Sequence, residues 1–577
     1  MILQALVKLY DDLLAQGDIP RPGWTNTKVG HALCLDGQGN LVQIVPLVTE
    51  VVRNGKTVTV NQTMELPAQV KRSSGVLANF LCDNSGYMLG ADNKGKPERS
   101  LECFQACKDL HLLILSDCKG ETARAIIGFF TKWTPGKSEE NDAFAQAKEE
   151  LLKGANLIFR VNGVFAHEDK EIAEAWQKHY SGDGSGQEQV QCLVSGETDA
   201  LELVHPALKG VDGAQSSGAA LVSFNAPAFC SYHREQGYNA PIGKKAAFAY
   251  TSALNHLLAD RSNVQHIGDT TVVCWADGGE PQYRDLALAC LFNLPSAENE
   301  AFSESELHAA VKRLAEGLPC QELRIAPEKA FYILGLAPNA ARLSVRFFWR
   351  SSFGELMKNV NDHHERMKIV GNKYTYIPIW AMLRATANSN SKDKAASPVM
   401  AGAVTRAIIS GTRYPAALLE NTMLRIRAER DITSNRAAII KAYYLKNQDE
   451  RCPKEVLTVA LNENSTNIPY TIGRLFAVYE AAQEQANPGI NATIKDKYFN
   501  SVAATPAHIL PLLNDLYQHH LKKLPQGSQV YFEKQVGELL SILGEEFPLR
   551  LSLPEQGAFQ LGYYHQKQKR FEKKENK

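Results

Sequence analysis

The sequence predicts an α+β protein with a β-rich N-terminal domain, a mixed α/β middle domain and an all-α C-terminal helical bundle. Strand-like runs separated by tight-turn signals crowd residues 29–70. Gly/Ser-rich loops at 181–190 and 210–219 surround a middle segment, and helical apolar periodicity takes over from about residue 400. At 577 residues the chain is too long for one ordinary core. We therefore expect three domains, at residues 1–200, 201–395 and 396–577.

The N-terminal domain is expected to open with an amphipathic helix and to continue as strands. Leu6, Leu9 and Leu13 lie at helical spacing. The runs "VGHALCLD" and "LVQIVPL" then flank the turn "GQGN". The runs "EVVR" and "TVTVNQTMEL" flank Asn54-Gly55-Lys56, and Asn-Gly favours a tight hairpin turn.

A short, donor-rich loop follows these strands in "PAQVKRSSGVLANFLCDNSGYMLG", residues 67–90. Its basic pair suits phosphates or guanine edges, its asparagines suit base edges, and its serines and glycine permit close backbone approach. The alternative is an exposed turn that closes the sheet. The residues expected to contact nucleic acid are Lys71, Arg72, Ser73, Ser74, Gly75, Asn79 and Asn84.

A second candidate is the stretch "SYHREQGYNAPIGKKAAFAYTSALNHLL", residues 231–258, in which a donor-rich loop runs into an alanine-rich helix. Backbone N–H groups at a helix N-terminus suit a phosphate. The alternative is a capped core helix. The candidate DNA- or RNA-binding residues at this terminus are Asn239, Gly243, Lys244 and Lys245.

The C-terminal part is expected to be a bundle, because stripes such as Ile472, Leu475, Phe476 and Tyr479 recur at helical spacing. It also begins with a basic run. Residues 366–446 carry 14 Lys and Arg against 4 Asp and Glu, although the whole chain has a net charge of zero. A solvated helix face mixes signs more evenly, so we favour a track for a polyanion. Its residues are Arg406, Arg413, Arg425, Arg427, Arg430, Arg436 and Lys441.

No catalytic site is expected. Cys103, Cys107 and His111 fall on one helical face, but the sequence lacks paired CxxC spacing, so buried thiols are favoured over zinc. The "DHHE" run at 362–365 lacks the further aspartates of a two-metal site and is expected to be a solvated helix face. The "PGKS" run at 135–138 lacks the first glycine of a phosphate-binding loop. We expect neither a metal nor a cofactor.

The expected location is the bacterial cytoplasm. The N-terminal stretch has no basic region followed by an apolar block, and no apolar run reaches membrane-spanning length. Eleven scattered cysteines are an odd number and fit a reducing compartment.

Several long motifs, in order, resemble one family, the large subunit of the type I-C CRISPR surveillance complex called Cascade. They are "MILQAL", "PAQVKRSSGVLANFLCDNSGYMLG", "SFNAPAFCSYHREQGYNAPIGKKAAFAYTSALN", "RAAIIKAYYLKN", "IGRLFAVYEAAQ" and "LGYYHQKQ". The resemblance covers essentially the whole chain. It departs at one turn: after "NAP" the family often has a small residue and an acid, whereas this chain has Ile242-Gly243-Lys244-Lys245.

The resemblance implies a non-enzymatic subunit of an antiviral ribonucleoprotein. Such a subunit recognises the protospacer-adjacent motif (PAM) in double-stranded DNA, promotes strand opening and R-loop formation, and offers a docking surface for a helicase-nuclease. The implied partners are CRISPR RNA, target DNA, the backbone subunits, the subunit that holds the 5′ handle, and the small subunit. The loop at 67–90 would then contact the motif-proximal duplex, 239–245 the duplex or the RNA, and the basic run the non-target strand or neighbouring subunits.

The resemblance also implies that about residues 456–577 are made separately as the small subunit. No methionine follows Met423, so this product would start at Met423 or at a non-standard codon. Val456, Leu457 or Val459 are preferred, because they lie just ahead of a self-contained helical run.

Two other function classes remain as alternatives. A metal-dependent nuclease would use Asp362, His363 and His364 and would cleave with magnesium or manganese. A purely structural scaffold would join subunits with no dependence of DNA binding on Lys71 or Arg72. The family resemblance favours DNA recognition over both.

Overall fold

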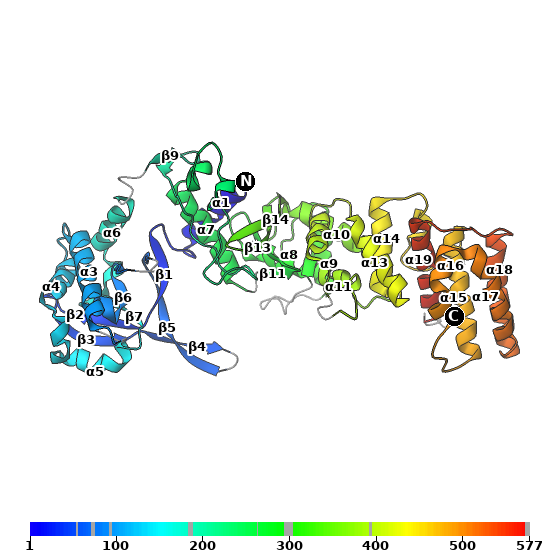
Figure 1. Cartoon of the computed structure of the whole chain (residues 1–577), viewed down its shortest axis with the longest axis horizontal. Coiled ribbons are helices and arrows are strands. Elements are labelled where there is room, and N and C mark those ends of the chain that lie inside the picture. The colour runs from blue at the N-terminus through cyan, green and yellow to red at the C-terminus, as the bar shows by residue number, and fades with distance from the viewer. Residues whose placement is uncertain are drawn as a thin grey trace. The chain divides into compact units, whose positions relative to one another are not determined.

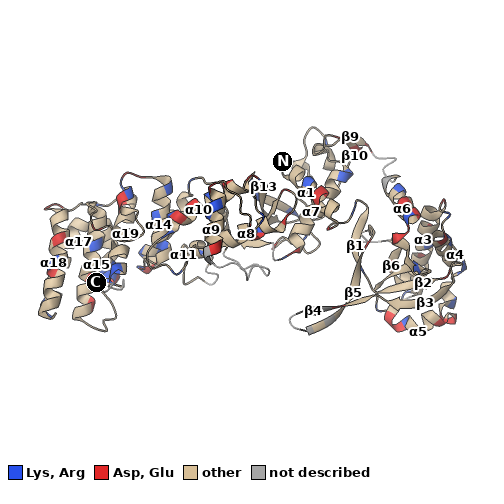
Figure 2. Ribbon diagram, turned by 180° about the vertical axis from the view of Figure 1, so that it is seen from behind, with Lys and Arg blue, Asp and Glu red and all other residues tan. Residues whose placement is uncertain are grey.

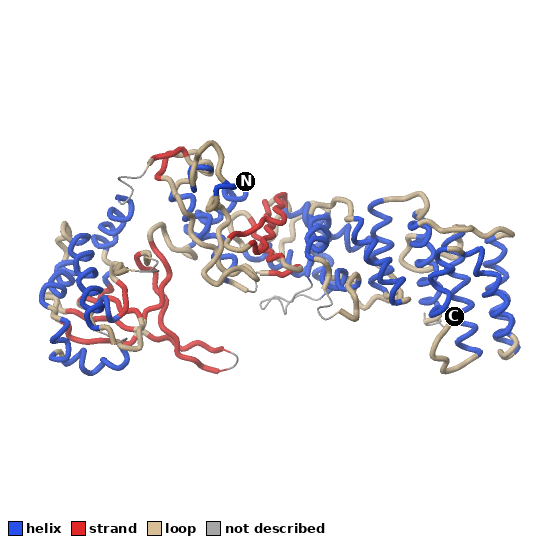
Figure 3. Tube along the Cα trace, viewed as in Figure 1, coloured by secondary structure: helices blue, strands red, loops and turns tan. Residues whose placement is uncertain are grey.

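The computed structural model describes residues 1–53, 56–70, 75–91, 95–182, 188–261, 264–292, 304–391 and 395–571. It divides into two compact units (Figure 1). Unit 1 comprises residues 1–206 and 223–253, and unit 2 comprises 207–222 and 254–577. Unit 1 thus holds the predicted N-terminal domain and a segment of the predicted middle domain. The α+β class is confirmed, with strands in both units and helices throughout the C-terminal part (Figure 3).

Unit 1 is built on a mixed sheet with the strand order β3-β2-β7-β6, and β8 pairs with β7. The parallel pair is β2 with β7, and the other pairs are antiparallel. The turn "GQGN" joins β2 to β3, as predicted. The strands are β2 (His31–Leu35), β3 (Leu41–Pro46), β6 (Cys82–Asn84), β7 (Asn156–Val161) and β8 (Val164–Phe165).

A long hairpin leaves this body (Figure 1). Strand β4 (Val48–Arg53) pairs with β5 (Lys56–Pro67) in a register that ends with Arg53 opposite Lys56. This register leaves two residues for the connection, which matches the predicted tight hairpin, although Asn54 and Gly55 lie outside the described residues. The other half of β5 pairs with β1 (Trp24–Val29).

The helices between residues 85 and 182 form a hydrophobic core with the unit 1 sheet. The first helix buries Leu6, Leu9 and Leu13, as its spacing predicts. The helices of unit 1 are α1 (Ile2–Gln16), α2 (Ser85–Met88), α3 (Pro97–Leu115), α4 (Glu121–Lys132), α5 (Asp142–Leu151), α6 (Lys170–Gly182) and the first part of α7 (Lys244–Ala259), within which the unit boundary falls. The short strands β9 (Gln189–Gln191) and β10 (Thr198–Ala200) pair ahead of α7.

Unit 2 begins with an antiparallel sheet in the order β11-β12-β13-β14. Every residue of β12 is buried, in keeping with its four β-branched residues followed by Cys274, Trp275 and Ala276. The strands are β11 (Gln265–Ile267), β12 (Thr270–Ala276), β13 (Ala330–Asn339) and β14 (Arg342–Ser352). The helices α8 (Pro281–Phe292), α9 (Glu304–Ala315) and α10 (Phe353–Met367) accompany this sheet.

All described elements after β14 are helices, and one hydrophobic core runs from Ile267 in β11 to Tyr564 near the C-terminus. The predicted stripe Ile472, Leu475, Phe476 and Tyr479 is buried. The remaining α-helices are α11 (Ile379–Ala385), α12 (Pro398–Ile409), α13 (Ala416–Glu429), α14 (Ser434–Asn447), α15 (Ile468–Ala486), α16 (Ile494–Ala504), α17 (Pro506–Leu521), α18 (Gln526–Leu543) and α19 (Leu553–Lys569).

Helices α15 and α19 pack unusually closely because each has a glycine at their contact. A methyl group on Gly473 would lie 2.0 Å from the Phe559 carbonyl oxygen, and one on Gly562 would lie 2.0 Å from that of Tyr470. Any larger residue at either position would push the helices apart. In the part of the chain that the structure describes, no helix has the length and apolarity needed to cross a membrane.

Candidate nucleic-acid interface

The loop that follows β5 is held at both ends by buried polar contacts. Lys71, Arg72, Ser73 and Ser74 lie outside the described residues, so their expected contacts remain predictions. At the entrance, the Val70 N–H donates to the Asn79 side-chain oxygen at 2.9 Å. The Asn79 N–H in turn donates to the buried Asp83 carboxylate at 3.0 Å. The loop is therefore closed across its base.

Asn79 is a structural residue of this loop. Only 6% of it is exposed, and its carbonyl oxygen is bonded to Val70. In this structure Asn79 shapes the loop, and its side-chain oxygen is bonded to backbone rather than exposed for the expected base-edge contact. Asn84 is half-buried, and its side-chain oxygen accepts the Gly86 N–H at 3.0 Å and caps α2. An asparagine at an N-cap satisfies a helix donor that would otherwise lack a partner.

The far side of the loop carries a cation that the sequence reasoning missed. Gly75 is exposed, and its carbonyl accepts a hydrogen bond from Arg99 at 3.0 Å. Arg99 lies in the first turn of α3 and is itself exposed. It stands 24 residues from Gly75 in the sequence, so only the packing of α3 beside the loop brings them together.

A buried histidine anchors the end of this connection to α3. The Leu81 N–H donates to the Nε2 atom of His111 at 2.9 Å, and Nδ1 lies 2.7 Å from the Cys107 carbonyl. Burial lowers the pKa of His111 to about 4, so the ring is neutral with its proton on Nδ1. Since both nitrogens are used, His111 has none left for a metal. Among the described residues, no group of three His, Cys, Asp or Glu side chains is arranged to hold one.

The N-terminus of α7 is already occupied by a carboxylate. The Lys245 N–H donates to the Asp199 side chain at 2.9 Å, and a methyl group on Gly243 would lie 2.5 Å from the same carboxylate. Lys244 is half-buried and Lys245 is exposed. The Asp199 carboxylate thus accepts from one of the backbone N–H groups that the sequence offered to a phosphate, and the expected contacts of Lys244 and Lys245 remain predictions.

Asn239 ties together the loop that precedes α7. Its side-chain oxygen accepts the Ser231 N–H at 2.8 Å, and its amide nitrogen donates to the carbonyls of Arg234 and Gln236 at 3.0 and 3.1 Å. With its donors and acceptor used within the loop, Asn239 shapes the segment rather than reading a base. The residues that it arranges, from Ser231 to Gln236, are all exposed.

The basic run of unit 2 is only partly accessible. Arg406, Arg413, Arg427 and Arg430 are exposed, and Arg425 is half-buried. In contrast, 4% of Arg436 and 2% of Lys441 are exposed. Figure 2 shows acidic as well as basic residues along the helices of this unit. A single track made of all seven residues is therefore not present, and the expectation is wrong for Arg436 and Lys441.

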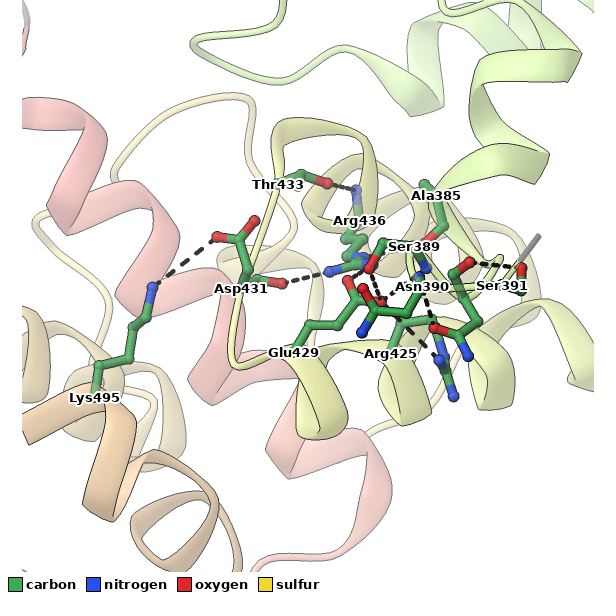
Figure 4. A network of polar contacts seen from close by, with 11 residues as sticks. Ala385, Ser389, Asn390, Ser391, Arg425, Glu429, Asp431, Thr433, Arg436 and Lys495 are labelled. Carbon is green, nitrogen blue, oxygen red and sulfur yellow. Dashed lines mark hydrogen bonds and ion pairs between the residues drawn. The ribbon is translucent and has the colours of Figure 1, made fainter. Parts of the chain in front are cut away.

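Arg436 joins three segments of unit 2 (Figure 4). It donates to the Ala385 carbonyl at 3.0 Å and to the Asp431 carbonyl at 2.9 Å, and it forms an ion pair with Glu429. Ser389 also donates to Glu429, and Arg425 lies 4.0 Å from the same carboxylate. A buried guanidinium needs such partners, so this arginine organises the fold rather than a ligand.

The residues of the nuclease alternative do not converge. Asp362 is exposed, whereas His363 and His364 are buried. His363 bonds to the Tyr414 hydroxyl at 2.7 Å, and His364 bonds to the Cys290 carbonyl at 3.0 Å. Burial lowers the pKa of both rings, that of His364 to about 4. Both histidines belong to the core of unit 2, which is also a correction to the expected solvated face.

The family comparison covers nearly all of these elements. The model of the family described as CRISPR-associated protein (Cas_Csd1) matches residues 6–571. A comparison with curated protein sequences finds no significant match. The match begins within α1, ends just beyond α19, and includes both of the asparagine-shaped loops. The chain therefore belongs to the Cas_Csd1 family of CRISPR-associated proteins.

Proposed function

We propose that this protein is the non-catalytic large subunit of a type I-C Cascade ribonucleoprotein, and that it recognises the PAM in double-stranded DNA. It promotes strand opening and R-loop formation and provides a docking surface for the helicase-nuclease. The observation that carries the proposal is the family match over nearly the whole chain, which supports the role of a Cascade large subunit. The loop at 70–79 supports the assignment of the DNA-reading site.

The loop suits a weak and quick readout. The described residues on either side of Lys71 to Ser74 in the sequence are bonded: Val70 to Asn79, and Gly75 to Arg99. Lys71 to Ser74 supply two cations and two hydroxyl groups. Arginine reads guanine in the major groove, and lysine neutralises phosphates. A few such contacts are enough, because base pairing with the CRISPR RNA reads the rest of the target.

The test is binding of the reconstituted complex to duplexes that differ only in the flanking motif, at two salt concentrations. Wild type should discriminate between flanks. Arg72→Ala and Lys71→Ala should lose discrimination or bind more weakly, with a shallower salt dependence for a residue that contacts phosphate. The matched control is Lys28→Ala, a lysine of β1 in the same unit.

Three outcomes separate the alternatives. If both variants discriminate as well as wild type, the loop is a structural turn and the reader lies elsewhere. If DNA binding depends neither on Lys71 or Arg72 nor on the flanking motif, the result favours a structural scaffold over a DNA-reading subunit. If the isolated chain cleaves DNA with magnesium or manganese and His363→Ala abolishes the cleavage without unfolding the protein, the non-catalytic assignment fails.

A further inference from the structure

Among the residues that the structure describes, the most exposed aromatic side chain has no role in the sites above. The structure exposes 92% of Tyr232, more than of any other large hydrophobic residue among those it describes. Phe229 and Tyr238 are also exposed, within ten residues of one another along the chain. Aromatic side chains normally bury most of their surface, so a ring exposed to this degree is unusual.

Tyr232 sits at the tip of a strained turn. The Arg234 N–H donates to the Ser231 carbonyl at 3.0 Å, which closes a four-residue turn. The two central residues, Tyr232 and His233, have φ values of 55° and 56°. This mirror-image turn class favours Asn and Gly, because other side chains crowd the backbone at positive φ. Three of the nine non-glycine residues with positive φ in the described chain fall between 232 and 236.

Contacts below the turn hold this conformation. The Asn239 side chain makes three hydrogen bonds to the backbone of residues 231, 234 and 236. Gly237 packs closely on the backbone of Glu202 and Leu203, so that a methyl group on it would lie 2.6 Å from the Glu202 carbonyl oxygen. Strained backbone persists where the surroundings hold it, and it is concentrated at functional sites. The ring is thus presented in advance, without a large ordering cost on binding.

We propose that the turn Ser231–Arg234 is a stacking platform for an unpaired base of the target DNA. Tyr232 stacks on the base, and His233 and Arg234 contact the neighbouring base or phosphate. Tyrosine, histidine and arginine all have planar groups that stack on unpaired bases, and arginine also binds the backbone. The inference rests on the proposed function and adds to it the contact that retains a base once the duplex opens.

Nucleic acid fits this turn better than a protein partner does. The core of a protein interface is a contiguous apolar patch with few charges. Around Tyr232, the exposed residues Ser231, His233, Arg234, Glu235 and Gln236 are all polar or charged. Ser231, His233 and Arg234, which flank the ring in the turn, can each donate a hydrogen bond to a base or a phosphate, whereas Glu235 lies outside the turn.

The test uses the reconstituted ribonucleoprotein and target duplexes in which an abasic site replaces one base at a time next to the flanking motif. Wild type should lose about tenfold in affinity at one or two positions, the size expected for one stacked base. The Tyr232→Ala complex should lose a similar factor in affinity for the intact target. An abasic site at those same positions should then cause no further loss, because the ring and the base form one contact. Tyr232→Phe should bind like wild type.

A matched control is Tyr531→Ala, which removes another exposed tyrosine, on α18, and should change nothing. Equal affinities of wild type and Tyr232→Ala for every duplex would overturn the inference. Loss of a protein subunit from the Tyr232→Ala complex, with unchanged DNA affinity of the assembled remainder, would also overturn it and make the turn a protein contact.

The same duplexes test the proposed function separately. If wild type discriminates between flanks but no position depends on Tyr232, only the stacking inference fails. If wild type ignores the flank, motif recognition fails, while a Tyr232-dependent base position would still establish the stacking contact.

Discussion

Two asparagines that the sequence offers as nucleic-acid contacts, Asn79 at a base edge and Asn239 at the duplex or the RNA, hold backbone groups in the structure. Asn79 accepts from Val70, and Asn239 bridges three residues of its own loop. A structural asparagine and a base-contacting one look alike in the sequence, because asparagine is favoured both in irregular loops and at base edges. Two properties of the folded chain distinguish a structural asparagine from one that contacts a base. They are the burial of the side chain and the presence of nearby backbone groups that lack a helix or strand partner.

Lys441 allows a test at the residue scale of whether a buried cation of the basic run takes part in DNA binding. It is buried, and burial lowers its pKa to about 8. Lys441→Met should therefore leave DNA binding and its salt dependence unchanged and should not destabilise the protein, because a buried ammonium is costly. Arg413→Ala, at an exposed position, should reduce the salt slope by about one if that residue contacts a phosphate. A salt slope that falls in the Lys441 variant would contradict this assignment.

The buried histidines predict an acid-sensitive fold. Burial lowers the pKa of His111, His205, His364 and His565 to about 4. Between that value and the ordinary 6.5, the unfolded chain binds protons that the folded chain does not, so stability rises with pH. The thermal unfolding midpoint should therefore fall as the pH is lowered from about 6.5 toward 4. A midpoint that stays constant over this range would mean that the rings are solvated.

At the scale of elements, helix ends and helix crossings decide what the chain can bind. The N-terminus of α7 looks like an anion site in sequence, yet Asp199 of β10 caps it from 46 residues away. Conversely, α3 begins beside the loop between β5 and β6, so Arg99 of α3 can donate a hydrogen bond to Gly75 of that loop. Both arrangements depend on how elements that are distant in sequence pack together.

The crossing of α15 and α19 predicts a large effect of one methyl group. Gly473→Ala would place its methyl 2.0 Å from the Phe559 carbonyl oxygen, so the helices must separate. We expect a loss of about 3 kcal/mol or more in the stability of unit 2. Gly537→Ala on α18 is the matched control, since nothing lies within 4 Å of its added methyl group. It should stabilise the helix by about 0.5–1 kcal/mol. Thermal unfolding measures both, and equal midpoints would contradict the close crossing.

At the scale of the whole molecule, unit 2 bears on the proposed small subunit. Met423 is buried inside α13, so a product starting there would begin in the middle of a helix. Val456 lies between α14 and α15, as the buried last residue of the short 3-10 helix Lys454–Val456. The structural argument therefore supports a start near Val456 for the proposed separate product.

This fragment should not behave as an independent soluble domain. In the full chain, α19 packs on α14 and α13: a methyl group on Gly557 would lie 2.8 Å from the Tyr444 ring of α14, and Gln556 accepts from Arg427 of α13 at 2.7 Å. A product of residues 456–577 lacks α14 and exposes this face. We expect mass spectrometry to find the fragment bound within the complex, and the isolated fragment to self-associate. Expression that yields no C-terminal fragment would rule out the separate product.

The sequence by itself determined the α+β class, the antiparallel pairing of the two strands that flank Asn54 and Gly55, the helical C-terminal part and the family. These features follow from local periodicity, turn chemistry and long ordered motifs, which are properties of neighbouring residues. Only the tertiary structure decided which polar side chains are exposed and free of internal hydrogen bonds, and so able to contact a ligand. Arg436 and Lys441 became buried, Asp199 capped α7, His111 bonded to Leu81, and Tyr232 was left exposed on a held turn. Burial and long-range hydrogen bonds depend on segments that pack from far along the chain, and no local pattern records them.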